Sequence, residues 1–411
     1  MKERSTSQER SDLRMKQIAF ASLIVSLLIL SIVSVTSISS NHVGLKKSIA
    51  SPIRQSLPTQ YEISEPLVIS SNTDFALFGA TGAGTPSDPY TFEYLQISSN
   101  ETCIRVSDTT AYFVLSNCRF ESNATYGAVW FDNVENGRVE ECEFIGTESG
   151  IYFSESNDCS VVNNTIYNCW NGVNFQLASN CSVINNKIHN SNRGVLLEHT
   201  THCDIINNSI YSNLVYGVDV GFLSNNNTVY GNSIGWNGQR NAIDMGENNT
   251  FDNGISIGNR WSDYNESETY VIPGTGLSID EYAQLLDDTT NPIIVPAYDV
   301  AIDVDSVGNV LSWTTGDEFP DLYFIEQDSV QVILAVWSEN EITFSLDHLR
   351  QGPHTITLTV YDGAGNVASD DVFVSVVSFI LGGIGTELVM IASGATVVFF
   401  VLIIIVIKRM S

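Results

Sequence analysis

The stretch "NNTIYN" at residues 163–168 returns as "NNKIHN" at 185–190 and as "NNSIYS" at 207–212, each time after 22 residues. The apolar residue that closes this step recurs along the chain in both directions. Its positions are Phe120, Phe144, Ile166, Ile188, Ile210 and Ile234. A unit of about 22 residues with no helical pattern cannot bury its own apolar side, so its copies must stack. The repeat therefore predicts a parallel β-helix.

Each copy contains three short segments with the pattern of a β-strand. One follows a small residue, as in "GIYF" at Gly150, "GVNF" at Gly172, "GVLL" at Gly194, "GVDV" at Gly217 and "AIDM" at Ala242. Another begins at Cys159, Cys181 and Cys203. Turns rich in Asn, Gly and Ser join the segments. We expect about eight or nine such coils to fill residues 61–265.

Stacking in register places each residue beside the one that lies a repeat later, which creates columns of like side chains. One column contains Asn164, Asn186, Asn208 and Asn232, preceded by Cys118 and Cys142. A second contains Cys159, Cys181 and Cys203. Asparagine at a sharp bend adopts unusual backbone angles and bonds to neighbouring coils, and cysteine fills a narrow interior. We interpret both columns as structural ladders.

The chain of 411 residues is acidic, with 18 Lys plus Arg against 47 Asp plus Glu and a formal charge of -29. A surface of this sign repels phosphate backbones, so we expect no nucleic-acid partner. The chain has 7 cysteines, and an odd number argues against a complete disulfide framework.

Both ends of the chain are apolar. Residues 18–35 follow a basic stretch, which makes residues 1–40 a signal peptide or an uncleaved signal anchor. Residues 388–407 predict a transmembrane helix, and Lys408 and Arg409 follow at once. The sequence thus predicts a single-pass protein of the cell membrane with a large extracellular domain and a cytoplasmic C-terminus.

The pattern changes after the repeats. In the segment 266–296, "SIDEYAQLLDD" at 278–288 predicts a short capping helix, and a proline-bearing linker follows it. Residues 297–378 show strands with alternating apolar positions and resemble an immunoglobulin-like or related β-sandwich without paired cysteines. We interpret this module as a spacer. The predicted fold class is therefore all-β, a β-helix followed by a β-sandwich, with a hydrophobic helix at each end.

Four motifs add a family resemblance. They are "GAGTPSDPYTFEYLQI" from Gly82, "YFVLSNCRF" from Tyr112, "GNRWSDY" from Gly258 and "YVIPGTGLSIDEY" from Tyr270. With the repeat they resemble the NosD-like right-handed parallel β-helix proteins of archaeal surfaces, over about residues 61–285. The resemblance implies the right-handed coil and the two ends of the solenoid. Members are variously linked to periplasmic copper delivery for nitrous oxide reductase, carbohydrate binding or sugar hydrolysis, and the fold does not choose between these functions.

A candidate catalytic site lies on the outward strand face. Counting two residues past each small residue gives Tyr152, Asn174, Leu196, Asp219 and Asp244, and counting four gives Ser154, Gln176 and Glu198. Asp219 and Asp244 would then be neighbours about 5 Å apart, with Glu198 on the diagonal. Retaining glycosidases use carboxyl groups at this separation, and clustered carboxylates also hold calcium. Arg193 and Arg240 precede two of the small residues and are candidates to bind acidic sugars or to act as the base of a lyase, although arginine is also an ordinary surface residue.

Candidate glycan-binding residues are Tyr152, Asn174 and Gln176 on this face and the aromatic Tyr167 and Tyr211. Tyr167 and Tyr211 share a column with His189. Aromatic rings in a row stack on sugar rings, but they equally shield strand edges. Sequons for N-glycosylation predict an exposed glycoprotein surface. They begin at Asn100, Asn123, Asn163, Asn180, Asn207, Asn226, Asn248 and Asn265. We interpret Asn163 and Asn207, which lie in the repeated step, as turn residues rather than glycan acceptors.

Copper delivery would need a cluster of His, Cys and Met ligands. The stretch "EHTTHC" brings Glu198, His199, His202 and Cys203 close in sequence, but no CxxC pair occurs, and we predict no metal site. We therefore favour an anchored surface protein that binds glycans or envelope components. Short, uniform turns argue against an enzyme; the alternatives are a polysaccharide lyase, a glycoside hydrolase or a copper-delivery protein. No cofactor is expected, and calcium is the ion that a carboxylate cluster would take.

Overall fold

The structure is a computed structural model that describes residues 61–266, 269–338 and 340–378. The expected signal segment at 1–40 and the expected membrane helix at 388–407 lie outside the described residues. In the part of the chain that is described, no helix is both long and apolar enough to cross a bilayer.

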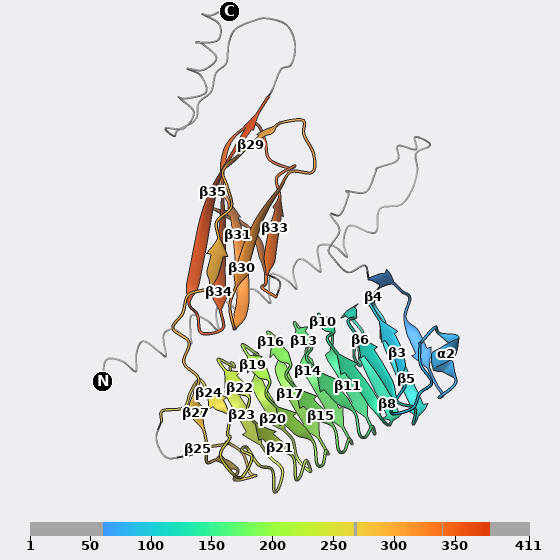
Figure 1. Ribbon diagram of the computed structural model, residues 1–411. Helices are drawn as coiled ribbons and strands as arrows, with labels where there is room; N and C mark the ends of the chain where they lie inside the picture. Colours follow the sequence, from blue (N-terminus) through green and yellow to red (C-terminus); the bar gives the residue numbers. More distant parts are fainter. Residues whose placement is uncertain (1–60, 267–268, 339, 379–411) are drawn as a thin grey trace, which may run out of the picture. The chain divides into compact units, whose positions relative to one another are not determined.

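The repeats form a parallel β-solenoid with three sheets (Figure 1). Sheet A contains β1 (Glu62–Ile63), β4 (Leu95–Ser99), β7 (Arg119–Ser122), β10 (Glu143–Ile145), β13 (Thr165–Tyr167), β16 (Lys187–His189), β19 (Ser209–Tyr211), β22 (Ser233–Gly235), β24 (Arg260–Trp261) and β27 (Gln284–Leu285). Sheet B contains β2 (Leu67–Ile69), β5 (Ile104–Thr109), β8 (Val129–Val134), β11 (Ser149–Ser154), β14 (Asn171–Gln176), β17 (Arg193–Glu198), β20 (Tyr216–Val220) and β23 (Arg240–Asp244). Sheet C contains β3 (Tyr90–Glu93), β6 (Phe113–Ser116), β9 (Gly137–Glu140), β12 (Ser160–Val162), β15 (Ser182–Ile184), β18 (Asp204–Ile206) and β21 (Thr228–Tyr230). The expected parallel β-helix is confirmed.

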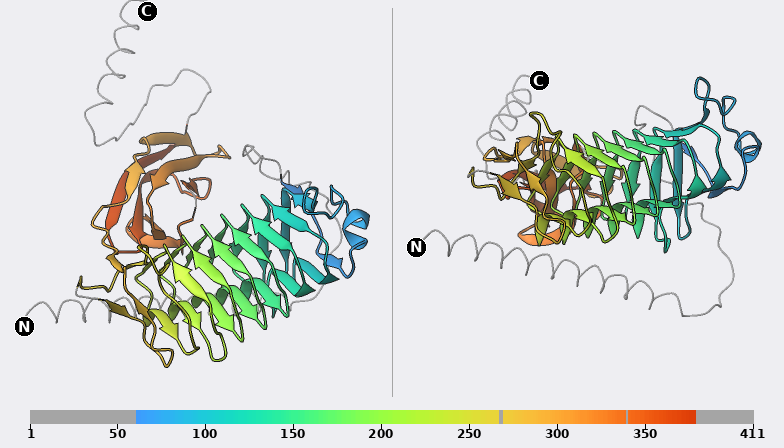
Figure 2. Two further views of the ribbon diagram at one scale, coloured as in Figure 1. Left: turned by 60° about the horizontal axis from the view of Figure 1, so that its bottom comes forward. Right: turned by 90° about the horizontal axis from the view of Figure 1, so that it is seen from below.

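The register follows the repeat. Ile166 pairs with Ile188, and Ile188 pairs with Ile210, so each strand lies beside its equivalent in the next coil (Figure 2). Apolar residues from all three sheets point inward and form one buried core. Within it Phe153 stacks on Phe175 with ring centroids 4.6 Å apart. Buried apolar columns of this kind are what make the coils stack.

The two asparagines of the repeated step have different tasks. The first, as in Asn163 and Asn185, has φ of +56°, the left-handed conformation that asparagine tolerates. The second is buried and bonds to the adjacent coils. The Asn164 N–H donates to Asn186 Oδ1 at 2.8 Å, and Asn186 Nδ2 donates to the Val161 carbonyl at 2.8 Å. Asn208 and Asn232 repeat this pattern, so the buried backbone groups of the bend are satisfied.

The other two bends have ladders too. In one bend, Cys159, Cys181, Cys203 and Asn227 occupy the equivalent position of successive coils. Asn227 Oδ1 accepts a hydrogen bond from the Cys203 N–H at 2.9 Å. In the other, the Cys169 N–H donates to Ser191 Oγ at 3.2 Å, and asparagines follow in later coils. All seven cysteines are buried and free. Burial raises the pKa of the Cys169 thiol to about 12, so it stays protonated.

The ends of the solenoid are closed by local structure. At the first end, α2 (Asp74–Leu77) places Phe75 against Tyr90 and Phe113, with centroids 5.0 and 4.9 Å away. The capping helix expected at 278–288 is wrong. That segment instead forms β26 (Ile279–Asp280), which pairs with β25 (Tyr270–Val271), and β27, which extends sheet A.

Asp280 explains why this segment stays extended. It is fully buried, and its Oδ2 accepts hydrogen bonds from the Asn259 N–H at 2.7 Å and from Trp261 Nε1 at 2.9 Å. The carboxylate thus takes the place of the next asparagine in the ladder. A helix here would withdraw that acceptor and leave buried donors unpaired.

Residues 293–377 form a separate two-sheet unit, here named the C-terminal unit. One sheet contains β28 (Ile293–Val295), β30 (Val310–Gly316) and β33 (Glu341–Ser345). The other contains β29 (Val300–Asp303), β31 (Pro320–Gln327), β32 (Val330–Val336), β34 (Gly352–Asp362) and β35 (Val367–Val377). Residues from both sheets share a buried core that includes Trp313 and Ile325. The unit contacts sheet A through Phe319, whose ring lies 5.3 Å from that of Tyr211.

Candidate functional site

The outer face of sheet B carries three columns of mostly polar and aromatic side chains. The central column contains Arg105, Trp130, Tyr152, Asn174, Leu196, Asp219 and Ile243. A second contains Asp132, Ser154, Gln176 and Glu198. A third contains Asn171, Arg193, Tyr216 and Arg240. The structure thus brings Tyr152, Asn174, Gln176, Glu198 and Asp219 to one face, as the sequence predicts.

The predicted carboxylate pair is wrong, because Asp244 lies on the opposite side of its strand. Asp219 pairs with Ile243, and Asp244 pairs with Val220. Asp244 is fully buried and accepts a hydrogen bond from Ser278 Oγ at 2.6 Å. The count from Ala242 therefore ends one residue too far along the strand, and a slip of one residue moves a side chain to the other face of a sheet.

The slip has a steric cause. In the four preceding coils the small residue is glycine (Gly150, Gly172, Gly194 and Gly217), and a Cβ at Gly217 would lie 2.5 Å from the Asn241 carbonyl oxygen of the next coil. β23 is the last strand of sheet B, so no further strand of that sheet crowds this position. Asn241 therefore occupies the position that glycine has in the preceding coils, and counting two residues from Asn241 rather than from Ala242 gives Ile243.

Asp219 is bound to a different partner. Its Oδ2 accepts a hydrogen bond from Arg193 Nε at 2.8 Å, and its side chain is only 13% exposed. Burial raises the pKa of Asp219, while Arg193 lowers it and the Glu198 carboxylate raises it further. Asp219, Arg193 and Glu198 therefore form one electrostatically coupled group.

An aromatic cluster, Tyr126, Trp130 and Tyr152, lies near the other end of this face. The rings of Tyr126 and Trp130 are stacked with centroids 4.5 Å apart, and Tyr152 lies 6.1 Å from Tyr126. The Arg105 guanidinium lies 4.1 Å from the centre of the Trp130 ring, within cation–π range. Tyr126 is 52% exposed. The cluster therefore combines an open aromatic surface with polar neighbours.

Sequence reasoning missed Tyr126 and Trp130. Trp130 stands two residues past the small Ala128, so the count that found Tyr152 would have found it one coil earlier. Tyr126 lies in a turn outside the repeat, and no spacing identifies it. Gln176 accepts a hydrogen bond from the Tyr152 hydroxyl, which links the cluster to the second column.

Polar atoms without partners gather on this face. Among the described residues, nine buried side-chain nitrogen or oxygen atoms lack a hydrogen bond, and four of them belong to these columns. They are Arg105 Nε, Trp130 Nε1, Asn171 Oδ1 and Asn174 Oδ1. Unmade hydrogen bonds of buried groups are rare in folded proteins and call for an explanation such as a ligand or water.

The prediction of glycan-binding faces at Tyr167 and Tyr211 is wrong. Both rings stack on His189, with centroids 5.4 and 5.0 Å away, but Tyr211 is fully buried and its hydroxyl donates to the Pro320 carbonyl at 3.0 Å. Tyr167 is 6% exposed. The C-terminal unit covers this column, and no periodicity of the solenoid reports that contact.

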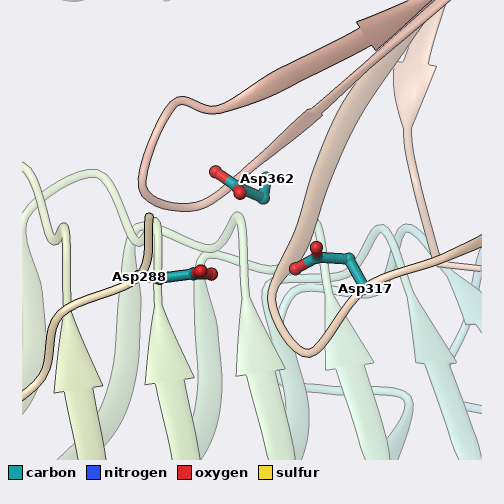
Figure 3. A group of neighbouring side chains, drawn as sticks. All are labelled: Asp288, Asp317 and Asp362. Carbon is teal, nitrogen blue, oxygen red and sulfur yellow. The ribbon is translucent and has the colours of Figure 1, made fainter. Parts of the chain in front are cut away.

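The stretch "EHTTHC" does not assemble a soft-metal site. The Cys203 thiol is buried and donates to the Thr201 carbonyl, whereas His199 and His202 are exposed at turns. In the described ranges, the group whose ligand atoms lie within 4.8 Å of one another is Asp288, Asp317 and Asp362, on three segments far apart in sequence (Figure 3).

These three aspartates gave no signal in the sequence. Each is held by an adjacent amide: the Thr290 N–H donates to Asp288, the Phe319 N–H to Asp317 and the Asn366 N–H to Asp362. Burial raises the pKa of Asp317 and of Asp362. The carboxyl groups thus have protein partners already and make local turns.

Comparison with known proteins gives the following matches. A family model described as periplasmic copper-binding protein (NosD) matches residues 95–266. An alginate lyase from Paenibacillus sp. str. FPU-7 is similar at 12% identity and a TM-score of 0.34, over 52% of this chain and 92% of that one. Tailspike protein 2 of bacteriophage CBA120 is similar at 10% identity and a TM-score of 0.33, over 76% of this chain and 71% of the tailspike chain. No curated protein matches the sequence significantly. The activities in these names belong to those proteins.

Proposed function

Because residues 95–266 form a NosD-like parallel β-helix, we propose that this protein is a surface β-helix protein that binds glycans through the outer face of sheet B. The observation that carries the proposal is the aromatic cluster at Tyr126, Trp130 and Tyr152 beside polar atoms that lack partners. Ligand sites combine aromatic surface with a few polar groups that fix orientation.

The chemistry of the face suits sugar rings. Aromatic rings pack against the apolar C–H faces of a sugar, and hydroxyl, amide and carboxylate groups exchange hydrogen bonds with its hydroxyls. Ser154, Asn174, Gln176 and Glu198 supply such groups on adjacent coils. An unmade hydrogen bond of a buried group costs about 1–3 kcal/mol, so a ligand that reaches Asn174 Oδ1 would recover part of that cost.

The test uses the purified full chain in a non-denaturing detergent, with a panel of neutral and acidic polysaccharides in the presence and absence of calcium. We would follow retention on each polymer and the release of new chain ends in the same samples. Retention without release is expected, and Trp130→Ala should weaken it. Absence of retention on every polymer would overturn the proposal.

A second candidate function is cleavage of a polysaccharide, since Asp219 is a largely buried carboxyl group whose pKa is raised by burial and by the nearby Glu198 carboxylate. Pairs of carboxyl groups in different environments are the acid and base of glycosidases. Release of chain ends that disappears in Asp219→Asn or Glu198→Gln would establish an enzyme. Copper delivery has no comparable support, because Cys203 is buried away from His199.

The placement at the cell surface is also a proposal. The expected membrane helix at 388–407 follows the C-terminal unit, which we propose is an immunoglobulin-like β-sandwich that spaces the solenoid from the bilayer. Digestion of intact cells with an added protease should then remove the solenoid and leave a short membrane-bound fragment. Full protection of the chain in intact cells would contradict an outward orientation.

A further inference from the structure

Two of the three arginines of this face are paired with carboxylates. Arg105 Nη2 bonds to Asp132 Oδ2 at 2.8 Å, and Arg193 Nε bonds to Asp219 Oδ2 at 2.8 Å. The Arg105 guanidinium also packs over Trp130, which fixes its position. Further N–H groups of both guanidiniums remain for hydrogen bonds, Arg105 Nε among them. The positive charge of each, however, is already offset by its aspartate, so a ligand carboxylate gains less attraction there than it would from an unpaired arginine.

The remaining charges do not favour an anion. The three columns hold three guanidinium groups and three carboxylates, so their formal charges cancel. Glu198, at the end of the second column, has a carboxylate without a hydrogen bond or ion pair among the described residues. Arg240 is the guanidinium left over, and it lies in β23, away from the aromatic cluster. The chain as a whole carries a formal charge of -29.

From this balance we propose that the face binds uncharged glycans and rejects polymers that carry a carboxylate on each sugar, such as polyuronates. The inference rests on the proposed glycan-binding function. A neutral chain meets the aromatic cluster and the amide and hydroxyl groups of Ser154, Asn174 and Gln176, while Glu198 accepts hydrogen bonds from its hydroxyls. A polyuronate brings a carboxylate next to Glu198 and meets the net negative field of the protein.

The experiment uses a matched pair of polymers. The neutral polysaccharide that the full chain retains best is compared with the same polymer oxidised to a carboxylate at C6. We expect at least tenfold weaker binding of the oxidised form at low salt, and a smaller difference at high salt because salt screens the repulsion. Equal or tighter binding of the oxidised form would overturn the inference, as would a panel in which only polyanions are retained. A panel that retains nothing overturns the proposed function itself.

A charge variant separates the face from the net charge of the protein. Asp132→Asn releases Arg105 from its ion pair, so the ratio of oxidised to neutral polymer binding should rise at least fivefold. Asp204→Asn makes the same change of charge at an exposed position of sheet C and should leave the ratio as it is. An equal rise in both variants, or no rise in Asp132→Asn, would contradict recognition by this face.

Discussion

Two aromatic groups on the solenoid have opposite environments. On sheet A, Tyr167, His189 and Tyr211 stack in one column and are buried. On sheet B, Trp130 and Tyr152 also form a cluster with Tyr126 of the turn before β8, but Tyr126 is half exposed. Except for Tyr126, these residues lie on the outer side of a sheet, and the repeat pattern alone does not show which of the two groups is open to a ligand.

The difference between them comes from the C-terminal unit. Phe319 and Pro320 of that unit contact Tyr211, and the Asn190 amide donates to the Asp321 carbonyl at 2.9 Å. The sheet A column is therefore part of an internal contact surface, and the sheet B cluster is the one left for a ligand. An outer-face aromatic ladder becomes a binding site only where no other part of the chain covers it.

The largest effect should come from Tyr211→Ala, because Tyr211 is fully buried between His189 and Phe319. Loss of a large buried aromatic side chain costs about 3–5 kcal/mol of the free energy of unfolding. The same truncation at the half-exposed Tyr126 should cost about 0.5 kcal/mol or less. Urea denaturation followed by tryptophan fluorescence measures both. Similar losses in the two variants would show that the sheet A column is not covered in solution.

The next effect concerns the pH dependence of stability. Burial lowers the pKa of His189 to about 3 from 6.5, so between these values the unfolded state binds a proton that the folded state does not. Its contribution to stability is full above pH 6.5 and is lost as pH falls, by about 1.4 kcal/mol for each pH unit. His189→Phe removes this loss. The free energy of unfolding of the variant should therefore rise relative to that of the wild type as pH falls from 6.5 to 4.5.

The variant comparison is needed because other groups act in the opposite sense. Burial raises the pKa of Asp317 and Asp362, and such carboxyl groups gain stability as pH falls. Both proteins share them, so their contribution cancels in the difference. His189→Phe also replaces two ring nitrogens that lack hydrogen bonds, and it should be at least as stable as the wild type at pH 7.5. A constant difference across the pH range would mean that His189 is solvated.

The fold could be predicted because the repeat is local. The spacing of the asparagine step and of the apolar positions places Asn164 beside Asn186 and Ile166 beside Ile188, and the structure shows both. The spacing predicts where a side chain lies only in coils that keep the same pattern of residues. It failed at Asp244, where the last strand of sheet B no longer needs glycine, and at 278–288, where the buried Asp280 holds the chain extended.

The candidate site could be predicted only in part. Tyr152, Asn174, Gln176 and Glu198 follow from counting along the repeat. Tyr126 does not, because it lies in an irregular turn. The burial of Tyr211 depends on a contact with residues more than a hundred positions away, and no local pattern carries that information.

For ligand binding, the largest effect is expected from Trp130→Ala. Trp130 stacks with Tyr126 and supports Arg105, so its loss removes one ring and loosens two neighbours. Retention of the neutral glycan should weaken at least tenfold, or about 1.4 kcal/mol. Trp170→Ala is the matched control, since Trp170 is 53% exposed in a turn outside the three columns. An equal loss of binding in Trp170→Ala would place the glycan elsewhere.

The smallest effect should come from Tyr152→Phe, which keeps the ring and removes the hydroxyl that donates to Gln176. Gln176 then loses the bond that fixes its side chain, while the aromatic cluster stays intact. We expect binding of the neutral glycan to weaken about threefold, roughly 0.65 kcal/mol. Tyr167→Phe removes a hydroxyl that donates to Glu143 at 2.8 Å in the covered column and should leave binding unchanged. If the two variants lost binding equally, the open cluster and the covered column would not differ in function, and the distinction between sheets A and B would fail.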